Sequence, residues 1–571
     1  MSWKHLAARL ATSLVLVAPA HAVTPGYVDN FTAPGVAGWD GGSALSNPLT
    51  GGVGGAADGY LRLHEPFSAH FGAKSSNPNY QGNWTDAGIA QVRFFLNDVA
   101  ADDVFQMHFL ITSLIDASTT WQYNPAWDPP RGQWQQHTVD VSSSANWTRI
   151  RGTGTFQNTL AAVDRIHFRH DLPPFTASSD SVAGDLGIDQ LTILKAQWYA
   201  TGSGNWSDAA NWVGPVPDVA DAAANLLGRP TVPATLSLTG PITVGTLTFD
   251  NLNTYTIAGG STLTLRSAAN ASISLAKGAH VISAPLQVDS NTTISGDGSL
   301  TTGNITNAAA MAIQCTVAAN DLDGAGTAAV GTGGVLRARH IRLSALALEA
   351  GSTVSVEPGG GDAGASVLNS LTIAGSTDAW LGTLDLADNI LVIHASPETR
   401  DQVFADAYNQ IKTARNAPSD LWTGPGITSS SAAADPRHMT ALGIMLNDPG
   451  SGRPIAASIH GLPLTANDIM IRYTWLGDAN LDGLVNADDY FRIDSNYIPQ
   501  KPGWYNGDFN YDSVVNADDY FLIDSAFLGQ TAPLASLAPP PNVAVPEPAV
   551  AALLAAALLT LRSRRASSPS P

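Results

Sequence analysis

Short segments in which apolar and polar residues alternate fill the chain from residue 196 to residue 366. They recur roughly every 8 to 12 residues, with Gly, Asn and Ser between them, which is a spacing typical of short strands. A strand this short cannot bury its apolar side alone, so consecutive coils must stack and share one core. The pattern predicts a β-helix or related solenoid, and a second β-sandwich is the rival architecture. The clearest segments are residues 236–238, 242–244, 247–249, 255–257, 263–265, 273–275 and 286–288.

Residues 23–195 are also predicted to be all-β. Apolar and polar residues alternate over residues 104–109 and 165–168, as they do in strands with one buried side. Many short strands of this kind pack as two sheets, so we expect an N-terminal β-sandwich of the jelly-roll type. The predicted fold class is therefore mostly β. The expected strands are residues 59–63, 89–96, 104–111, 137–141, 149–152, 165–169 and 188–194.

Residues 367–472 are expected to form a mixed junction between the solenoid and the C-terminal part. Strand signals continue through its first third and return at residues 469–473. Its one convincing helix covers residues 397–416, because apolar residues there recur at helical spacing. The apolar face of this helix consists of Val403, Phe404, Ala407, Tyr408 and Ile411.

The strongest chemical signal is an oxygen-rich segment at residues 477–489 that recurs at 507–519, a period of 30 residues (507 − 477 = 30). In a calcium loop, oxygens at positions 1, 3 and 5, a backbone carbonyl at position 7 and a carboxylate at position 12 surround one ion. Both segments fit this pattern, with Asn at position 9, so Ca²⁺ is the predicted cofactor. The predicted ligands are Asp478, Asn480, Asp482, Leu484 (carbonyl), Asn486 and Asp489, and Asp508, Asn510, Asp512, Val514 (carbonyl), Asn516 and Asp519.

The two loops differ at position 6, where the chain turns sharply. Gly483 suits this turn, because glycine adopts a positive φ without a steric penalty. Ser513 holds the same position in the second loop and must adopt a left-handed conformation there. We therefore expect the second calcium site to be the weaker one. A short helix should follow each loop, with its apolar face formed by Tyr490, Phe491 and Ile493, and by Tyr520, Phe521 and Ile523.

Over residues 473–530 these features resemble the type I dockerin module, which has two loop–helix repeats with Asp at position 12. The resemblance implies a small calcium-dependent fold, and in dockerins a cohesin partner binds the helix faces. Dockerin recognition pairs, often Ser-Thr, sit at positions 10 and 11. This chain has Ala487-Asp488 and Ala517-Asp518 at those positions, which argues against a cohesin partner.

Both ends of the chain carry export signals. Residues 1–22 combine Lys4 and Arg9 with a short apolar run and small closing residues, as in a secretory signal peptide. Residues 545–571 combine Pro546-Glu547-Pro548 with an apolar run and three arginines, as in a membrane segment whose basic end lies in the cytoplasm. Residues 531–544 are rich in Pro and Ala and are expected to be an extended linker.

The C-terminal segment, through Pro546, Glu547 and Pro548, resembles the PEP-CTERM sorting tails of Gram-negative bacteria. The resemblance implies an exosortase-type partner and a transient association with the inner membrane. Removal of the helix would then leave the protein at the cell surface or in the extracellular matrix. The alternative is a plain single-span anchor.

At Asp29-Asn30-Phe31 and Gly187-Ile188-Asp189 the sandwich resembles laminin-IV-like or carbohydrate-binding jelly rolls, and the segments after Trp198 resemble autotransporter-type β-helices. Exposed aromatic residues in such a jelly roll can stack on sugar rings, although they can also be loop anchors. Alternation places His167 on the solvent side of its strand. The candidate sugar-stacking residues are Trp121, Trp127 and Trp134, and the candidates for a structural cation site on adjoining terminal strands are Asp29 and Asp189.

Composition narrows the classes of function. A net charge of −20 argues against nucleic acid as a partner and fits cation binding. The single cysteine, Cys315, excludes disulfides within one chain. Glycoside hydrolysis typically uses two facing carboxylates, but the chain has only five Glu and none of the common hydrolase motifs.

We therefore expect an exported, non-catalytic surface or matrix protein, structural or adhesive, that binds exopolysaccharide or another glycan. One alternative is a polysaccharide-degrading enzyme or an accessory module of one. The other is a scaffold subunit recruited through the dockerin-like repeats.

Overall fold

The structure, a computed structural model, describes residues 23–534 except 101–102, 360, 417–420, 449, 451 and 460. The predicted signal peptide and the Pro546-Glu547-Pro548 motif lie outside these residues. The chain divides into two compact units, Met1–Gly259 and Gly260–Pro571. No described helix has the length and apolar character needed to cross a membrane.

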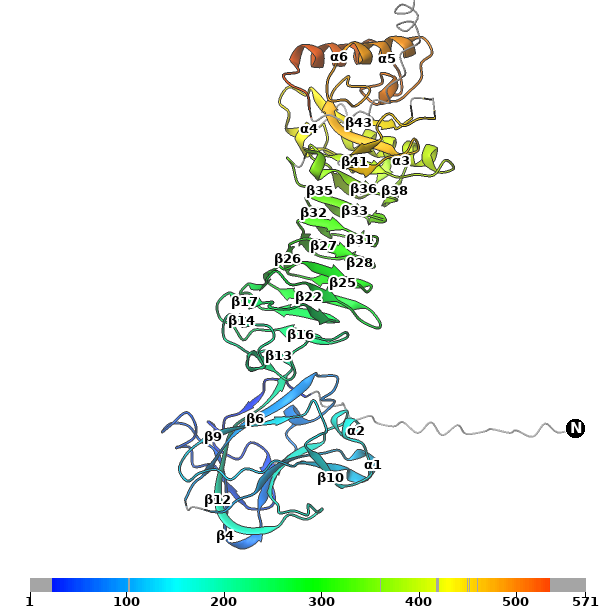
Figure 1. Ribbon diagram of the computed structural model, residues 1–571. Coiled ribbons are helices and arrows are strands. Elements are labelled where there is room, and N and C mark those ends of the chain that lie inside the picture. Colours follow the sequence, from blue (N-terminus) through cyan, green and yellow to red (C-terminus); the bar gives the residue numbers. More distant parts are fainter. Residues whose placement is uncertain are drawn as a thin grey trace, which may run out of the picture. The chain divides into compact units, whose positions relative to one another are not determined.

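Two antiparallel sheets form a jelly-roll-like sandwich in the first unit, as predicted (Figure 1). One sheet has the strand order β3-β4-β12-β6-β9, with β1 beside β12, and the other has the order β10-β8-β7-β11-β5-β2. The strands are β1 (Val28–Asp29), β2 (Trp39–Asp40), β3 (Ala44–Ser46), β4 (Leu61–His70), β5 (Gly72–Ser75), β6 (Ile89–Asp98), β7 (Met107–Thr112), β8 (Thr120–Tyr123), β9 (Gln135–Asp140), β10 (Trp147–Arg151), β11 (Arg165–His170) and β12 (Ser181–Lys195).

Alternation of side chains explains why these strands form two layers. In β7, Met107, Phe109 and Ile111 point into the sandwich core, and all three are fully buried. We expected this strand to begin three positions earlier. It begins later because the backbone N–H of Phe105 donates to the side chain of Asp128 instead of to a neighbouring strand.

Residues 196–259 complete the first unit and begin with a cluster of indoles. Trp212 packs edge to face against Trp198 and Trp206, with ring centroids 5.3 and 5.0 Å apart. Parallel strands follow: β14 pairs with β17, β17 with β20, and β16 with β19. These strands are β14 (Gly204–Asn205), β16 (Ala223–Leu226), β17 (Ala234–Ser237), β19 (Thr246–Asp250) and β20 (Tyr255–Ala258).

Three parallel ladders form a β-solenoid in the second unit (Figure 1). Each coil gives one strand to each ladder, which confirms the predicted β-helix and excludes the rival sandwich. The first ladder holds β21 (Leu263–Leu265), β24 (Leu286–Val288), β27 (Ile305–Asn307), β30 (Asp321–Asp323), β33 (His340–Leu343) and β36 (Ser366–Leu368). The second holds β22 (Ala271–Lys277), β25 (Thr292–Gly296), β28 (Ala310–Ile313), β31 (Thr327–Val330), β34 (Ala345–Leu348) and β37 (Leu371–Ile373). The third holds β23 (Ala279–Ile282), β26 (Ser299–Thr302), β29 (Thr316–Ala318), β32 (Val335–Ala338) and β35 (Thr353–Val356).

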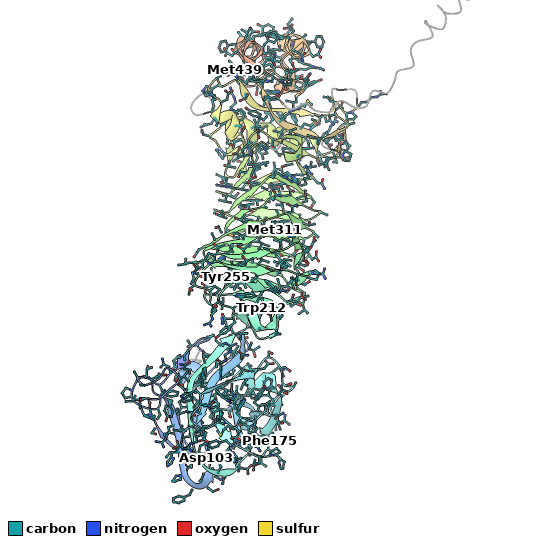
Figure 2. All side chains as sticks on the ribbon, turned by 60° about the vertical axis from the view of Figure 1, so that its left-hand side comes forward. Asp103, Phe175, Trp212, Tyr255, Met311 and Met439 are labelled. Carbon is teal, nitrogen blue, oxygen red and sulfur yellow. The ribbon has the colours of Figure 1, made fainter. Side chains whose placement is uncertain are left out.

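Stacked side chains hold these coils together. Ile273, Ile294, Ile313 and Val330 lie in register on four successive coils and are fully buried. Met311 is buried inside the same coils (Figure 2). Each such side chain contributes about 1.5–3 kcal/mol when it leaves water. The shared column supplies the core that no single short strand can form.

The ladders continue beyond residue 366. In the third ladder, β40 (Thr383–Asp385) pairs with β35, and β42 (Gly426–Thr428) pairs with β40. In the first ladder, β41 (Ile390–Ile393) pairs in parallel with β36 and then meets β46 (Ile469–Trp475) in the antiparallel direction. Strand β43 (Thr440–Leu446) completes this sheet beside β46.

One helix of the junction agrees with the prediction. Helix α3 (Arg400–Arg415) ends at Asn416, whose φ of 51° is left-handed and stops the helix. Its buried residues include Ala407 and Ile411 of the predicted apolar face. The helix lies against β42 and the antiparallel end of the first ladder, so it covers the last coils.

Candidate metal centre

The two predicted calcium loops share one backbone arrangement, and each leads into a helix. Asn486 and Asn516 cap these helices, and their side chains accept backbone N–H groups of the first turn. Asp489 and Asp519 in return accept the N–H groups of the capping asparagines, at 2.9 and 3.1 Å. This reciprocal capping holds the carboxylate of position 12 beside its loop. The helices are α5 (Ala487–Tyr497) and α6 (Ala517–Gly529).

The aspartates at positions 1 and 12 organise each turn. Asp478 accepts the N–H groups of positions 5 and 6, at 3.1 and 2.8 Å. Asp508 does the same in the second loop, at 3.1 Å for both. Asp489 also accepts the N–H groups of positions 2 and 3, at 2.9 and 3.4 Å. These bonds gather positions 1 to 6 and position 12 into one compact turn.

The turn at position 6 is left-handed in both loops. Gly483 has φ 92° and Ser513 has φ 73°, so the expected left-handed serine is present. In the second loop Asp512 and Val514 are exposed, whereas their counterparts in the first loop are half-buried. Both features favour a weaker second site, because a strained and more open loop encloses an ion less completely.

Four loop carboxylates are fully buried: Asp478, Asp489, Asp508 and Asp519. Burial, reinforced by the carboxylates of Asp489 and Asp482, raises the pKa of Asp478 to about 7. Burial also raises the pKa of Asp489 and of Asp519 to about 6 and shifts the pKa of Asp508 upward. A carboxylate removed from water is unfavourable as an anion unless an opposite charge lies near it.

The donor set fits a calcium ion. Arg415, at the end of α3, interacts electrostatically with Asp508 and Asp519 of the second loop, and a divalent cation would supply further positive charge to the buried carboxylates. Carboxylate, amide and carbonyl oxygens at these loop positions are the ligands that Ca²⁺ prefers. The predicted residues therefore suit the ion by their chemistry, although the three carboxylates of each loop do not all lie within 4.8 Å of one another in this structure.

Helices α5 and α6 pack together through reciprocal contacts. The Tyr490 hydroxyl donates to Asp524 on the other helix, and the Tyr520 hydroxyl donates to Asp494, both at 2.6 Å. Ile493 and its counterpart Ile523 are fully buried, as expected. Phe491 and Phe521 were expected on the same face, but they are 64% and 70% exposed. Two positions along a helix turn a side chain roughly 200° away, which puts these rings on the opposite side.

The three candidate sugar-stacking indoles are half-buried against other side chains. Trp121 and Trp127 pack against the sandwich core. The Trp134 indole donates to the Gly51 carbonyl at 2.9 Å and packs edge to face on Tyr60. Each ring therefore has a structural contact, and stacking on sugar stays a prediction.

The two aspartates proposed for a structural cation have different partners. Asp29 accepts hydrogen bonds from Tyr27, Trp39 and Tyr80, at 2.8, 3.0 and 2.7 Å. Asp189 lies instead beside Asp58, and burial, with that neighbouring carboxyl group, raises its pKa to about 6. The sequence reasoning missed Asp58, although its Gly-rich turn places it beside the closing strand.

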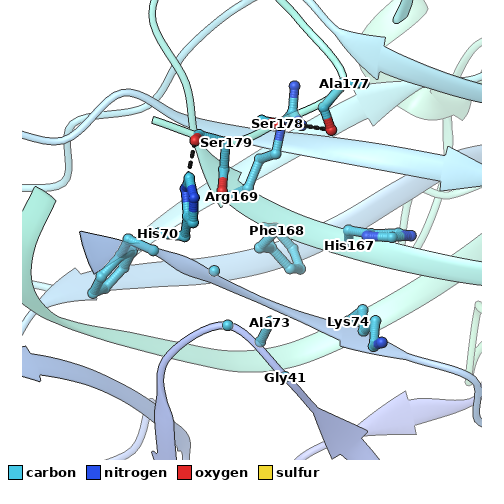
Figure 3. Close-up of a pocket in the computed structure, with 13 residues that line it drawn as sticks. Gly41, His70, Ala73, Lys74, His167, Phe168, Arg169, Ala177, Ser178 and Ser179 are labelled. Carbon is cyan, nitrogen blue, oxygen red and sulfur yellow. Dashed lines mark hydrogen bonds between the residues drawn. The ribbon is translucent and has the colours of Figure 1, made fainter. Parts of the chain in front are cut away.

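A pocket of about 340 Å³ opens on the outer face of the second sheet, between β5 and β11 (Figure 3). A hydrogen bond of 2.7 Å joins His70 to the Ser179 carbonyl at its rim. Lys74 and His167 face each other on paired strands. Burial and the cations around it lower the pKa of His167 to about 3, so this ring is a neutral and partly covered group rather than a free surface imidazole. The residues lining the pocket include no Asp or Glu.

Asp321, Asp323 and His340 bring possible ligand atoms within 4.8 Å of one another on adjacent coils. The two ring nitrogens of His340 lie 3.3 Å from Asp321 and 2.9 Å from Asp323. Arg339 also forms an ion pair with Asp321. Arg339 already supplies positive charge to Asp321, and the His340 ring contacts both carboxylates, so we interpret this cluster as a polar network between adjacent coils.

No protein-family model matches the chain, and no curated protein matches its sequence. Several solved structures match part of it. The family 11 carbohydrate-binding module from Clostridium thermocellum, solved with a β-1,3-1,4-mixed-linked tetrasaccharide, is 18% identical over 30% of this chain and 97% of its own, with a TM-score of 0.22. The CBM22-1 xylan-binding domain of Paenibacillus barcinonensis Xyn10C is 13% identical over 31% and 99%, with a TM-score of 0.21. The L4b domain of human laminin α-2 is 12% identical over 24% and 77%, with a TM-score of 0.17.

Substitution of the residue at position 6 tests the prediction that the second site has the lower Ca²⁺ affinity. Ser513→Gly should tighten the second site by up to about tenfold, because glycine avoids the ~1–2 kcal/mol that a left-handed L-residue costs. The matched change Gly483→Ser should weaken the first site by a similar factor. Calorimetric Ca²⁺ titration measures both constants, and an unchanged second site in Ser513→Gly would contradict the assignment.

The stability of the metal-free protein should fall as pH rises from about 4 to about 7. The folded-state pKa values of Asp478, Asp489 and Asp519 lie above the ~3.9 of an unfolded aspartate, so the folded form holds more protons in this window. Saturating Ca²⁺ should remove this dependence, because the ion binds the charged carboxylates. Thermal unfolding in EDTA and in Ca²⁺ across this pH range measures the direction of the change in stability. A metal-free Tm that rises with pH would contradict the prediction.

Proposed function

We propose that this chain is an exported surface or matrix protein, structural or adhesive, that binds polysaccharide through its sandwich and Ca²⁺ through its C-terminal loops. The observation that carries the proposal is the duplicated turn with its four buried carboxylates. Extracellular calcium modules operate with dissociation constants of about 10⁻⁴–10⁻³ M, which suits sites that stabilise a protein outside the cell.

The pocket between β5 and β11 supports a binding role for the sandwich. It is open and lined in part by side chains that can donate hydrogen bonds, including His70, Lys74 and Ser178. Its lining lacks the paired carboxylates that glycoside hydrolysis typically requires. This favours glycan binding over glycan cleavage at this place.

The proposed location follows from the two ends of the sequence. Residues 1–22 would direct export, and residues 545–571 would hold the chain in the inner membrane until an exosortase-type enzyme releases it. The protein would then reach the cell surface or the extracellular matrix.

A second candidate function is that of a scaffold subunit, and one observation favours it. Phe491 on α5, Ile498 just after α5, and Phe521 and Leu528 on α6 are 64%, 88%, 70% and 84% exposed. They form two equivalent pairs, because an apolar residue recurs 30 positions later in each case (521 − 491 = 30; 528 − 498 = 30). Exposed apolar residues in such an arrangement are typical of a protein interface.

Replacement of both phenylalanines tests the scaffold candidate. Phe491→Ser with Phe521→Ser should abolish binding to a panel of cohesin-type modules if these helices are the contact, and should leave Ca²⁺ uptake unchanged because both rings lie outside the loops. Surface plasmon resonance in Ca²⁺ measures the first quantity and calorimetry the second. Failure of the native protein to bind any module would exclude this candidate.

A glycan-array and turnover screen of the full-length protein, in Ca²⁺ and in EDTA, tests the main proposal. We expect binding without turnover. Lys74→Ala should weaken binding at least about tenfold, because a hydrogen bond to a charged group contributes about 1.5–3 kcal/mol. Lys501→Ala, an exposed lysine of the second unit, is the matched control. Turnover of any polysaccharide would overturn the non-catalytic role, and absence of binding would overturn the glycan-binding role.

A further inference from the structure

Strand β46 and helix α3 reach into both calcium loops. Strand β46 (Ile469–Trp475) overlaps the start of the predicted module, residues 473–530, so the name calcium module is kept here for the loops and helices that follow it, residues 476–530. The Thr474 hydroxyl, on β46, donates to Oδ2 of Asp478. The Tyr408 hydroxyl, on helix α3, donates to Oδ2 of Asp508. The first ligand of each loop therefore receives one hydroxyl group from the last coils of the solenoid, although the two donors come from different elements.

Two arginines hold the backbone of the loops in the same way. Arg472 on β46 donates to the Leu481 carbonyl at 2.8 Å. Arg415 at the end of α3 donates to the Asn510 carbonyl, also at 2.8 Å. Arg472 is 2% exposed, so its contact with the first loop is shielded from water.

The calcium module also packs closely on strand β43. The Tyr511 hydroxyl donates to the Leu442 carbonyl of β43 at 2.5 Å. A Cβ atom at Gly443 would come within 2.6 Å of the Trp504 indole and 2.5 Å of Leu481, so only glycine allows this approach. Trp504 in turn donates to the Asp478 carbonyl at 2.7 Å. The contact thus runs from the last sheet of the solenoid to a predicted calcium ligand.

A stack of coils needs a cover at its end, because its last coil has no neighbour to bury its apolar side. Strands β43 and β46 are the antiparallel end of the first ladder, and the calcium module lies against them. An autonomous module joined by a linker would not make these buried contacts.

We propose that the calcium module is the C-terminal cap of the solenoid, and that Tyr408 and Thr474 are positioning residues that couple Ca²⁺ binding to the folding of residues 383–475. The inference rests on the proposed calcium sites. Hydroxyl groups that orient a ligating carboxylate change metal affinity by about 10–100-fold when they are removed. Coupling is reciprocal, so calcium must stabilise the last coils as much as the coils strengthen calcium binding.

Calcium titration of the full-length protein and its variants tests the positioning role. Tyr408→Phe should weaken one site by about 10–100-fold, and Thr474→Val should weaken the other. Asp478→Asn, in the first loop, and Asp508→Asn, in the second loop, show which measured binding constant belongs to which site. Thr413→Val is the matched control, because this hydroxyl lies on the same helix as Tyr408 but bonds to the Asn409 carbonyl.

Hydrogen exchange of the native protein provides a second readout that needs no variant. Removal of Ca²⁺ should speed exchange in β43, β46 and α3, whereas coils between residues 299 and 356 should keep their protection. The coupling would be overturned if removal of Ca²⁺ changed hydrogen exchange only within residues 476–530. It would also be overturned if Tyr408→Phe and Thr474→Val both kept the native Ca²⁺ affinity. Neither result would overturn the calcium sites. No Ca²⁺ uptake by the native protein would overturn the proposed calcium sites as well.

Discussion

Burial of four carboxylates in two short loops governs the C-terminal part of the second unit. Asp478, Asp489, Asp508 and Asp519 are all fully buried. Their mutual repulsion and lost hydration oppose folding until positive charge enters. With Ca²⁺ bound as proposed, the loops, the reciprocal helix pair and the end of the solenoid would form one cooperative region stabilised by the ion.

A different constraint governs the rest of the chain. Strands of three to five residues carry too little apolar surface to fold alone, so each ladder depends on the same column of side chains, such as Ile273, Ile294 and Ile313. The sandwich solves the same problem with two facing sheets and one shared aromatic core. Both parts leave polar side chains on their outer faces. The pocket beside Lys74 lies on the outer face of the sandwich.

Features that depend on short-range spacing could be predicted from the sequence. Period-two alternation gave the strands, and the 30-residue repeat gave the loops, their helices and the left-handed Ser513. Contacts between distant segments could not. Tyr408 lies 100 residues from Asp508, and His340 meets Asp321 only because coils stack. The exposure of Phe491 on α5 was not predicted, because the elements that pack against the helix decide which of its faces is buried.

The hydrogen bonds of Leu534 have a mechanical consequence. Leu534 donates its N–H to the Gly483 carbonyl at 3.0 Å and accepts a hydrogen bond from Arg472 at 3.3 Å. A tensile load applied to the following residues would thus enter the molecule at the turn of the first loop. With Ca²⁺ bound as proposed, the ion would strengthen the bonds that resist this load, and the rupture force would rise with the calcium concentration of the surroundings.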